Sequence, residues 1–190
     1  MQIYAAELGE LHPMMVMQLR EVYPPQEAAA MAKALLMHIT GLSPGEMVLE
    51  KKRRLSESEI NFLQRAVKRL KRHEPLQYIT GSAFFHGYEF HVAPGVLIPR
   101  PETEELLDWV ISEYGHQNKK LDVLDIGTGS GCIAISLKKK IPRANLHAID
   151  LSQEALETAR ANADRLEAEV YFENLDILDE DARGMLGRYD

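Results

Sequence analysis

The chain has 190 residues, of which 45% are hydrophobic and 27% are charged, and its formal net charge is −7. This composition is typical of a globular protein of one or two domains, and the acidic balance argues against a protein whose bulk surface binds nucleic acid. The single cysteine excludes an internal disulfide and a cysteine-based metal site, and no apolar run reaches the ~18 residues that span a membrane. Without a signal-peptide pattern at the N-terminus, we expect a soluble, cytoplasmic protein.

The first 74 residues predict a small bundle of amphipathic helices. One helix can begin at Pro24-Pro25 and end at Gly41, and another begins at the capping box formed by Ser56 and Glu59. The apolar positions that recur at helical spacing are Ala28, Met31, Leu35 and Ile39 in the first of these helices and Ile60, Leu63, Val67 and Leu70 in the second. Because such helices must bury their apolar stripes against one another, a helical domain over residues 1–74 is expected.

A basic segment overlaps the last of these helices. Between residues 51 and 72 only Glu57 and Glu59 are acidic. The basic residues of the segment are Lys51, Lys52, Arg53, Arg54, Arg65, Lys68, Arg69, Lys71 and Arg72. A solvated helix face explains this charge without any function. The alternative is a docking surface for an acidic protein partner or for ribosomal or transfer RNA, and composition does not separate these partners.

Residues 75–99 predict a β-hairpin that links two domains. Aromatic, β-prone runs lie on either side of Gly87, and Pro94-Gly95 forms a further turn. His86 and His91 lie across this hairpin, but two histidines without a third ligand are more often structural, so no metal site is expected. A helix then begins near Pro101 and runs to about Tyr114, and its first turn is acidic. Capping of the helix dipole would by itself explain those acids.

A strand over 121–126 leads into three glycines at alternate positions: Gly127, Gly129 and Gly131. The helix that follows begins near Cys132, a residue expected to pack that helix on the sheet. A dinucleotide fingerprint has the spacing G-x-G-x-x-G, whereas the last glycine here comes one residue early and Asp125 stands two residues before the first. The loop resembles the first motif of class I S-adenosylmethionine (SAM) methyltransferases. A glycine-rich turn without a ligand and a site for a different nucleotide are the alternatives.

Two further acids follow the next predicted strands. A strand over 144–149 ends in Asp150, which at this spacing can accept hydrogen bonds from both ribose hydroxyls of a nucleoside. A third strand over 169–172 is followed by Asp176 and Ile177. Because ligands bind along the carboxyl ends of the strands of an open α/β sheet, we expect the glycine loop and these residues to converge on one crevice.

These elements predict an α/β fold: a small N-terminal helical bundle, a hairpin linker, and the first half of a Rossmann-like sheet. Three β–α units leave a doubly wound sheet unfinished. Tyr189-Asp190 has the character of a lead-in to a fourth strand. We therefore expect the chain to be a fragment of a longer protein.

Three segments in this order, Glu74–Gly81, Leu97–Glu104 and Leu124–Ile133, resemble the bacterial release factor glutamine N5-methyltransferases, the HemK/PrmC family. The resemblance implies a substrate-recognition domain at 1–74, a hairpin linker at 75–99, and the N-terminal part of a SAM-dependent methyltransferase domain at 100–190. It implies SAM as cofactor and, as substrate, the glutamine in the Gly-Gly-Gln motif of peptide chain release factors.

The resemblance also assigns cofactor contacts. Those it implies are Gly127, Thr128, Gly129, Ser130 and Gly131 in the loop, Asp150 at the ribose, Asp176 and Ile177 at the adenine, and Thr103 and Glu104 near the methionine end. The catalytic Asn-Pro-Pro-Tyr motif of the family orients the acceptor amide, whose nitrogen is a poor nucleophile, for attack on the sulfonium methyl. The 190 residues do not contain that motif, so no catalytic residue is assigned and this fragment is expected to be inactive.

Two other functions remain open at the level of sequence. One is a SAM-dependent methyltransferase of RNA or DNA, in which the basic segment would bind the phosphate backbone. The other is a module that docks a partner and holds half of a cofactor site without turnover.

Overall fold

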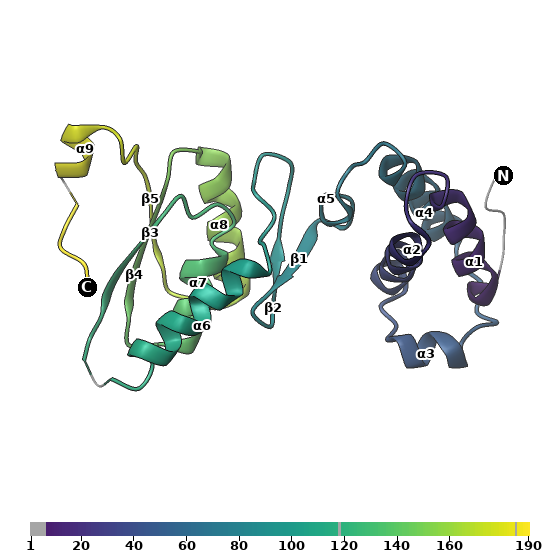
Figure 1. The fold of residues 1–190 in the computed structure, drawn as a ribbon, viewed down its shortest axis with the longest axis horizontal. Helices are drawn as coiled ribbons and strands as arrows, with labels where there is room; N and C mark the ends of the chain where they lie inside the picture. The colour runs from purple at the N-terminus through teal and green to yellow at the C-terminus, as the bar shows by residue number, and fades with distance from the viewer. Residues whose placement is uncertain (1–6, 118, 185) are drawn as a thin grey trace. The chain divides into compact units, whose positions relative to one another are not determined.

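The computed structural model describes residues 7–117, 119–184 and 186–190, and it divides into two compact units, residues 1–80 and 81–190 (Figure 1). The boundary falls between Thr80 and Gly81, because Ile79 packs in the core of the first unit while Phe85 and Phe90 pack in the core of the second. The predicted three-part division at 74/75 and 99/100 stays a prediction. Within the described residues, no helix is long and apolar enough to cross a membrane.

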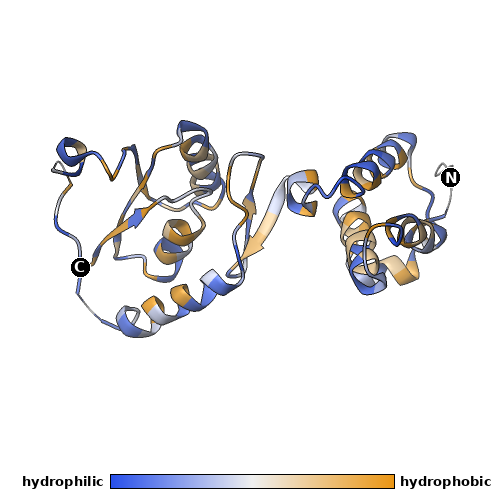
Figure 2. Cartoon of the chain, turned by 45° about the horizontal axis from the view of Figure 1, so that its top comes forward, coloured by the Kyte–Doolittle hydropathy of each residue, from blue (hydrophilic) through white to orange (hydrophobic). Residues whose placement is uncertain are grey.

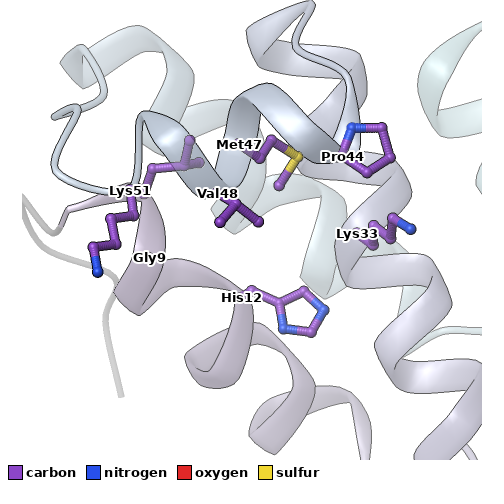
Figure 3. Close-up of a pocket in the computed structure, with 8 residues that line it drawn as sticks. Gly9, His12, Lys33, Pro44, Met47, Val48 and Lys51 are labelled. Atoms are coloured by element: carbon purple, nitrogen blue, oxygen red, sulfur yellow. The ribbon is translucent and has the colours of Figure 1, made fainter.

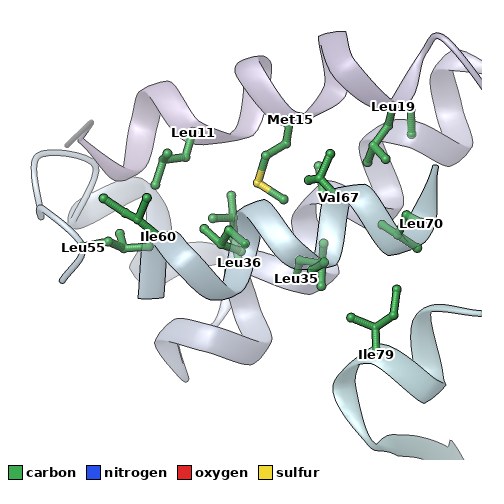
Figure 4. Packing of buried hydrophobic residues seen from close by; sticks show 14 of the residues in the cluster. Leu11, Met15, Leu19, Leu35, Leu36, Leu55, Ile60, Val67, Leu70 and Ile79 are labelled. Carbon is green, nitrogen blue, oxygen red and sulfur yellow. The ribbon is translucent and has the colours of Figure 1, made fainter. Parts of the chain in front are cut away.

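Unit 1 is the helical bundle expected from the sequence. Its helices are α1 (Leu8–Leu19), α2 (Pro25–Thr40), α3 (Pro44–Leu49), α4 (Glu57–Leu70) and α5 (Leu76–Thr80). Figure 4 shows leucine, isoleucine, valine and methionine side chains from these helices pointing toward one another. Leu11, Met15 and Leu19 of α1 are each 0% exposed, as are Leu35 and Leu63 on the facing helices. In Figure 2 the hydrophobic residues of this unit alternate with hydrophilic ones along the helices, the pattern of amphipathic helices around a single core.

The ends of these helices follow from local sequence. Ser43 and Ser56 each form a capping box with a glutamate three residues later, which satisfies backbone N–H groups that have no partner inside the helix. At the C-terminal end of α2, Gly41 takes a left-handed conformation (φ 69°), which a residue with a side chain adopts only at a cost in backbone strain.

The hairpin consists of β1 (Ser82–Phe85) and β2 (Tyr88–His91), paired antiparallel. Its two-residue turn is His86-Gly87, with φ of 49° and 82°, so both central residues are left-handed. Such turns match the right-handed twist of the strands. Phe85 and Phe90 point inward from the two strands, with ring centroids 6.2 Å apart.

The rest of unit 2 is a parallel sheet with helices between its strands. The elements are α6 (Glu102–Tyr114), β3 (Asp122–Ile126), α7 (Cys132–Lys140), β4 (Asn145–Asp150), α8 (Gln153–Arg165), β5 (Tyr171–Asn174) and α9 (Glu180–Gly184). The strand order is β3-β4-β5, and both pairs are parallel. In Figure 1, α6, α7 and α8 lie on one side of this sheet. The predicted α/β class, helical bundle, hairpin and half-sheet are thereby confirmed.

The third strand lies two residues further along the chain than the predicted range 169–172. Glu167 has φ of 51°, and Ala168 N–H donates to Ala163 O at 2.9 Å. These residues cap the C-terminal end of α8, so the extended strand begins only after them. The strand then continues through Asn174, because Asn174 pairs with Asp150 at the end of β4. At the end of the chain, residues 186–190 form no strand, but Asp190 N–H donates to Asp122 O at 2.9 Å and so lies beside the start of β3.

Candidate cofactor site

The glycine loop between β3 and α7 is built from left-handed backbone. Gly127, Gly129 and Gly131 have φ of 74°, 57° and 79°. A Cβ added to either of the first two would have no heavy atom within 4 Å, whereas one on Gly131 would lie 2.8 Å from Ile135 Cδ1. The first two glycines therefore leave open space over the backbone, and the third allows close packing of the loop on the helices.

Asp150, the last residue of β4, lies against this loop. Its Oδ2 accepts a hydrogen bond from Gly129 N–H at 2.8 Å, and its Oδ1 accepts one from Ser152 N–H at 2.9 Å. Each carboxylate oxygen has a second lone pair, so both can accept another hydrogen bond. The structure thus brings together the loop and the acid that the sequence places 19 residues beyond Gly131.

The end of β5 lies at the same edge of the sheet. The Asn174 side chain donates from Nδ2 to Asp150 O and to Leu151 O, both at 2.9 Å, and so joins the ends of β4 and β5. Asp176 and Ile177 follow in a half-buried turn in which Asp176 Oδ1 accepts Leu178 N–H at 2.9 Å. These two residues therefore share the edge with Asp150, and the Asp176 carboxylate orders its own turn.

Thr103 and Glu104 have different partners. Glu104 Oε1 accepts the backbone N–H of His86 at 2.9 Å and so holds the turn of the hairpin, while Thr103 N–H donates to Arg100 O at 3.0 Å in the first turn of α6. Among the described residues, neither forms a hydrogen bond with the glycine loop. The structure therefore gives Glu104 a role in fixing the hairpin turn, which the sequence did not indicate.

Two ionisable groups flank the loop in the chain, Asp125 before it and Cys132 after it. Burial raises the pKa of Asp125; hydrogen bonds from the Thr128 hydroxyl and the Ala134 N–H oppose this rise, and the charge of Asp150 adds to it. The Thr128 Oγ1 donates to Asp125 Oδ2 at 2.8 Å, which ties the second residue of the loop to the strand before it. Burial also raises the pKa of the Cys132 thiol to about 11. A thiol that stays protonated fits the packing role predicted for Cys132.

Known proteins resemble the chain along most of its length. Residues 15–81 match the PrmC N-terminal domain, and residues 123–186 match a methyltransferase domain. The release factor glutamine methyltransferase of Bacteroides thetaiotaomicron is 44% identical over 163 residues, which are 86% of this chain and 58% of that protein. The chain is similar to the release factor glutamine methyltransferase family in both of its units.

Two further release factor glutamine methyltransferases match similarly. The protein of Koribacter versatilis is 45% identical over 147 residues, which are 77% of this chain and 52% of that relative. The protein of Bacillus subtilis is 40% identical over 151 residues, which are 78% of this chain and 52% of that relative. The chain thus spans little more than half the length of these family members.

Sequence reasoning did not identify three exposed apolar side chains near the carboxyl ends of the strands, at the edge of the sheet that carries the glycine loop. Ile126, Leu151 and Leu178 each follow or end a strand, and they are 54%, 69% and 82% exposed. Large apolar side chains left exposed at the carboxyl ends of neighbouring strands are a candidate surface for a ligand or partner. The available signal was the position of Leu151, an apolar residue directly after the acid that ends a strand.

Unit 1 contains a cavity of about 430 Å³ between α1, α2 and α3, whereas the glycine loop belongs to unit 2. Figure 3 shows the side chains of His12, Lys33, Met47, Val48 and Lys51 around it. His12 Nε2 lies 3.2 Å from Ala29 O, so this histidine has a backbone partner. In the hairpin, His86 Nε2 lies 2.8 Å from Asp108 Oδ1, and no cluster of three metal-ligating side chains occurs in the part of the chain that the structure describes.

Proposed function

We propose that the intact protein transfers a methyl group from SAM to the side-chain nitrogen of the glutamine in the Gly-Gly-Gln motif of peptide chain release factors. Unit 2 would hold the methyl donor. The observation that carries this proposal is the hydrogen bond between Gly129 N–H and the Asp150 carboxylate. It brings the acid at the end of β4 to the glycine loop, in a chain similar to this family. The names of the relatives support the substrate.

The residues around the loop fit SAM. The open space over Gly127 and Gly129 allows a ligand to approach the backbone, and Asp150 keeps acceptor capacity for two ribose hydroxyls. The exposed Leu151 beside it suits one face of an adenine ring. When bound, SAM supplies an electrophilic methyl group on a sulfonium.

This part of the protein would act by binding and orienting the donor. The backbone N–H groups of Gly129 and Ser152 fix the Asp150 carboxylate before any ligand arrives, so little ordering of this side chain is needed on binding. Ser130 is buried and Gly131 packs tightly, which would keep the loop in one conformation. We assign no described residue to the orientation of the acceptor amide.

For the partner, we infer that unit 1 offers a basic surface. Three of the basic side chains form ion pairs inside the unit: Arg53 with Glu59, Arg69 with Glu74, and Lys71 with Glu21. Within the described residues, the other basic side chains of 51–72 form no ion pair, and they are exposed. They are Lys51, Lys52, Arg54, Arg65, Lys68 and Arg72. Such a surface suits an acidic patch of a release factor, or ribosomal RNA close to it in the cytoplasm.

Methyl transfer from labelled SAM by the intact protein tests the proposal. Purified release factor, the same factor with the Gly-Gly-Gln glutamine changed to alanine, and ribosomal RNA are the three substrates. Mass spectrometry should locate one new methyl group on that glutamine, with none on the altered factor. Labelling of the RNA alone would overturn the proposal in favour of a nucleic-acid methyltransferase.

A further inference from the structure

A single asparagine, Asn162 of α8, joins the hairpin to the glycine loop. Its side chain is 0% exposed and lies on the face of α8 that otherwise carries buried alanines and a leucine. An amide buried in this way is destabilising unless its donors and its acceptor find partners. Its presence on an apolar face therefore calls for a specific role.

All the hydrogen-bonding groups of this amide have partners. Oδ1 accepts the backbone N–H of His91 at 2.7 Å, while Nδ2 donates to His91 O and to Ser130 O, both at 3.0 Å. Both donors of the amide are thus used on backbone carbonyls. One side chain holds a strand of the hairpin with two hydrogen bonds and the glycine loop with a third.

The contact with the hairpin lies at the free edge of β2. Val92 N–H donates to Gly81 O, and because backbone groups alternate in direction along a strand, those of His91 turn away from β1. Asn162 binds both of them as a neighbouring strand would. One turn further along α8, Arg165 donates to Glu89 O on the same edge. Helix α8 therefore replaces a third strand.

The contact with the loop lies at Ser130, within the proposed donor site. Ser130 is 2% exposed, and the next residue, Gly131, packs against Ala159, which precedes Asn162 by three positions on the same face of α8. One residue before Ser130, Gly129 N–H donates to the Asp150 carboxylate. The loop is thus held at Ser130 by Asn162 and at Gly129 by Asp150.

We propose that Asn162 is a positioning residue for SAM: it sets the Ser130 carbonyl, and with it the glycine loop, relative to Asp150, and it makes this geometry depend on the docked hairpin. The inference rests on the proposed function, because an effect on SAM affinity requires that SAM binds at this loop. It adds a residue that touches no ligand and acts through the backbone of the loop.

The Asn162→Asp variant tests the proposal. It keeps the shape of the side chain and the oxygen that accepts His91 N–H, but it turns the donors into an acceptor that faces two carbonyl oxygens. At pH 8 we expect calorimetry on the intact protein to show SAM binding at least about tenfold weaker than in the wild type. At pH 6 the ratio should fall, because a carboxyl in these surroundings takes up a proton readily and can then donate one hydrogen bond.

The matched control is Ser136→Ala on α7. Ser136 is also 0% exposed, and its hydroxyl has no hydrogen-bond partner among the described residues, so this variant changes a buried polar group without touching the loop. It should bind SAM as the wild type does. If the folded Asn162→Asp protein binds SAM with wild-type affinity at both pH values, Asn162 is only structural and the proposal is overturned.

A second measurement needs neither SAM nor a stable aspartate variant. In Asn162→Ser, amide hydrogen exchange of the peptide that contains residues 127–132 should accelerate more than exchange of the buried strand β4. Equal acceleration of both would mean a general loss of stability and would overturn the proposal. If the wild type itself binds no SAM, the proposed function fails, and hydrogen exchange still decides the role of Asn162.

Discussion

The packing at Gly131 predicts a large and specific loss of stability in the Gly131→Ala variant. Alanine at φ of 79° costs about 1–2 kcal/mol relative to glycine. The new Cβ would also lie 2.8 Å from Ile135 Cδ1 and 3.1 Å from Ala159 Cβ. Ile135 is fully buried and Ala159 is fixed on α8, so relief requires a shift of the core that costs a further ~1–3 kcal/mol. The free energy of unfolding should therefore fall by about 2–5 kcal/mol, the sum of these two ranges.

Urea denaturation followed by circular dichroism measures this change, and Gly127→Ala is its matched control. Gly127 has almost the same φ, 74°, but a Cβ there meets nothing within 4 Å, so only the backbone cost of about 1–2 kcal/mol remains. The added methyl would instead stand in the open space proposed for SAM and weaken its binding. Equal destabilisation by the two variants would refute the assignment of Gly131 to packing between α7 and α8.

Three further predictions concern charge. Because folding raises the pKa of Asp125, the wild type loses stability as the pH rises from the unfolded pKa of this carboxyl to its folded pKa. The melting temperature of Asp125→Asn minus that of the wild type should therefore become more positive from pH 4 to pH 8. A constant difference would contradict the shift. With its pKa near 11, the Cys132 thiol should react with iodoacetamide at least about tenfold more slowly in the folded protein than in urea, and equal rates would show that it is accessible. Changing the exposed Arg65, Lys68 and Arg72 together to glutamate should raise the KM for release factor at unchanged SAM affinity, and an unchanged KM would make this face merely solvated.

Local sequence signals predicted most elements of the fold, because each signal acts within a few residues. The capping box at Ser56 starts α4, the left-handed Gly41 ends α2, and Gly87 occupies the hairpin turn. The error of two residues at β5 arises where a long-range contact decides the outcome. The register of that strand depends on the pairing of Asn174 with Asp150, which apolar periodicity does not encode.

The candidate site was predictable to the extent that it lies at strand ends. Parallel strands bring their carboxyl ends to one edge, so an acid after β4 must come near the loop after β3. The partners of side chains were not predictable in this way. Glu104 suited the start of a helix, yet its carboxylate binds the hairpin turn. Arg69 belongs to the basic segment, yet its guanidinium Nε donates to Glu74 at 2.7 Å and is not available to a partner.

Asn162 is another residue whose hydrogen-bond partners could not be predicted from the sequence. The helical stripe of Leu156, Ala159 and Ala163 predicts a buried face, and an asparagine on that face breaks the pattern. The break was visible in the sequence, but the backbone groups that satisfy the amide lie 71 and 32 residues away along the chain. Only the folded structure identifies them.

Calorimetric titration of SAM into Asp150→Ala tests most directly whether the glycine loop and Asp150 hold SAM. The change removes a charged acceptor whose hydrogen bonds to the ribose are worth about 1.5–3 kcal/mol each, so the dissociation constant should rise at least about tenfold. Asp164→Ala, an equal change of charge at an exposed position of α8, should leave the affinity unchanged. Wild-type affinity in Asp150→Ala would contradict the account.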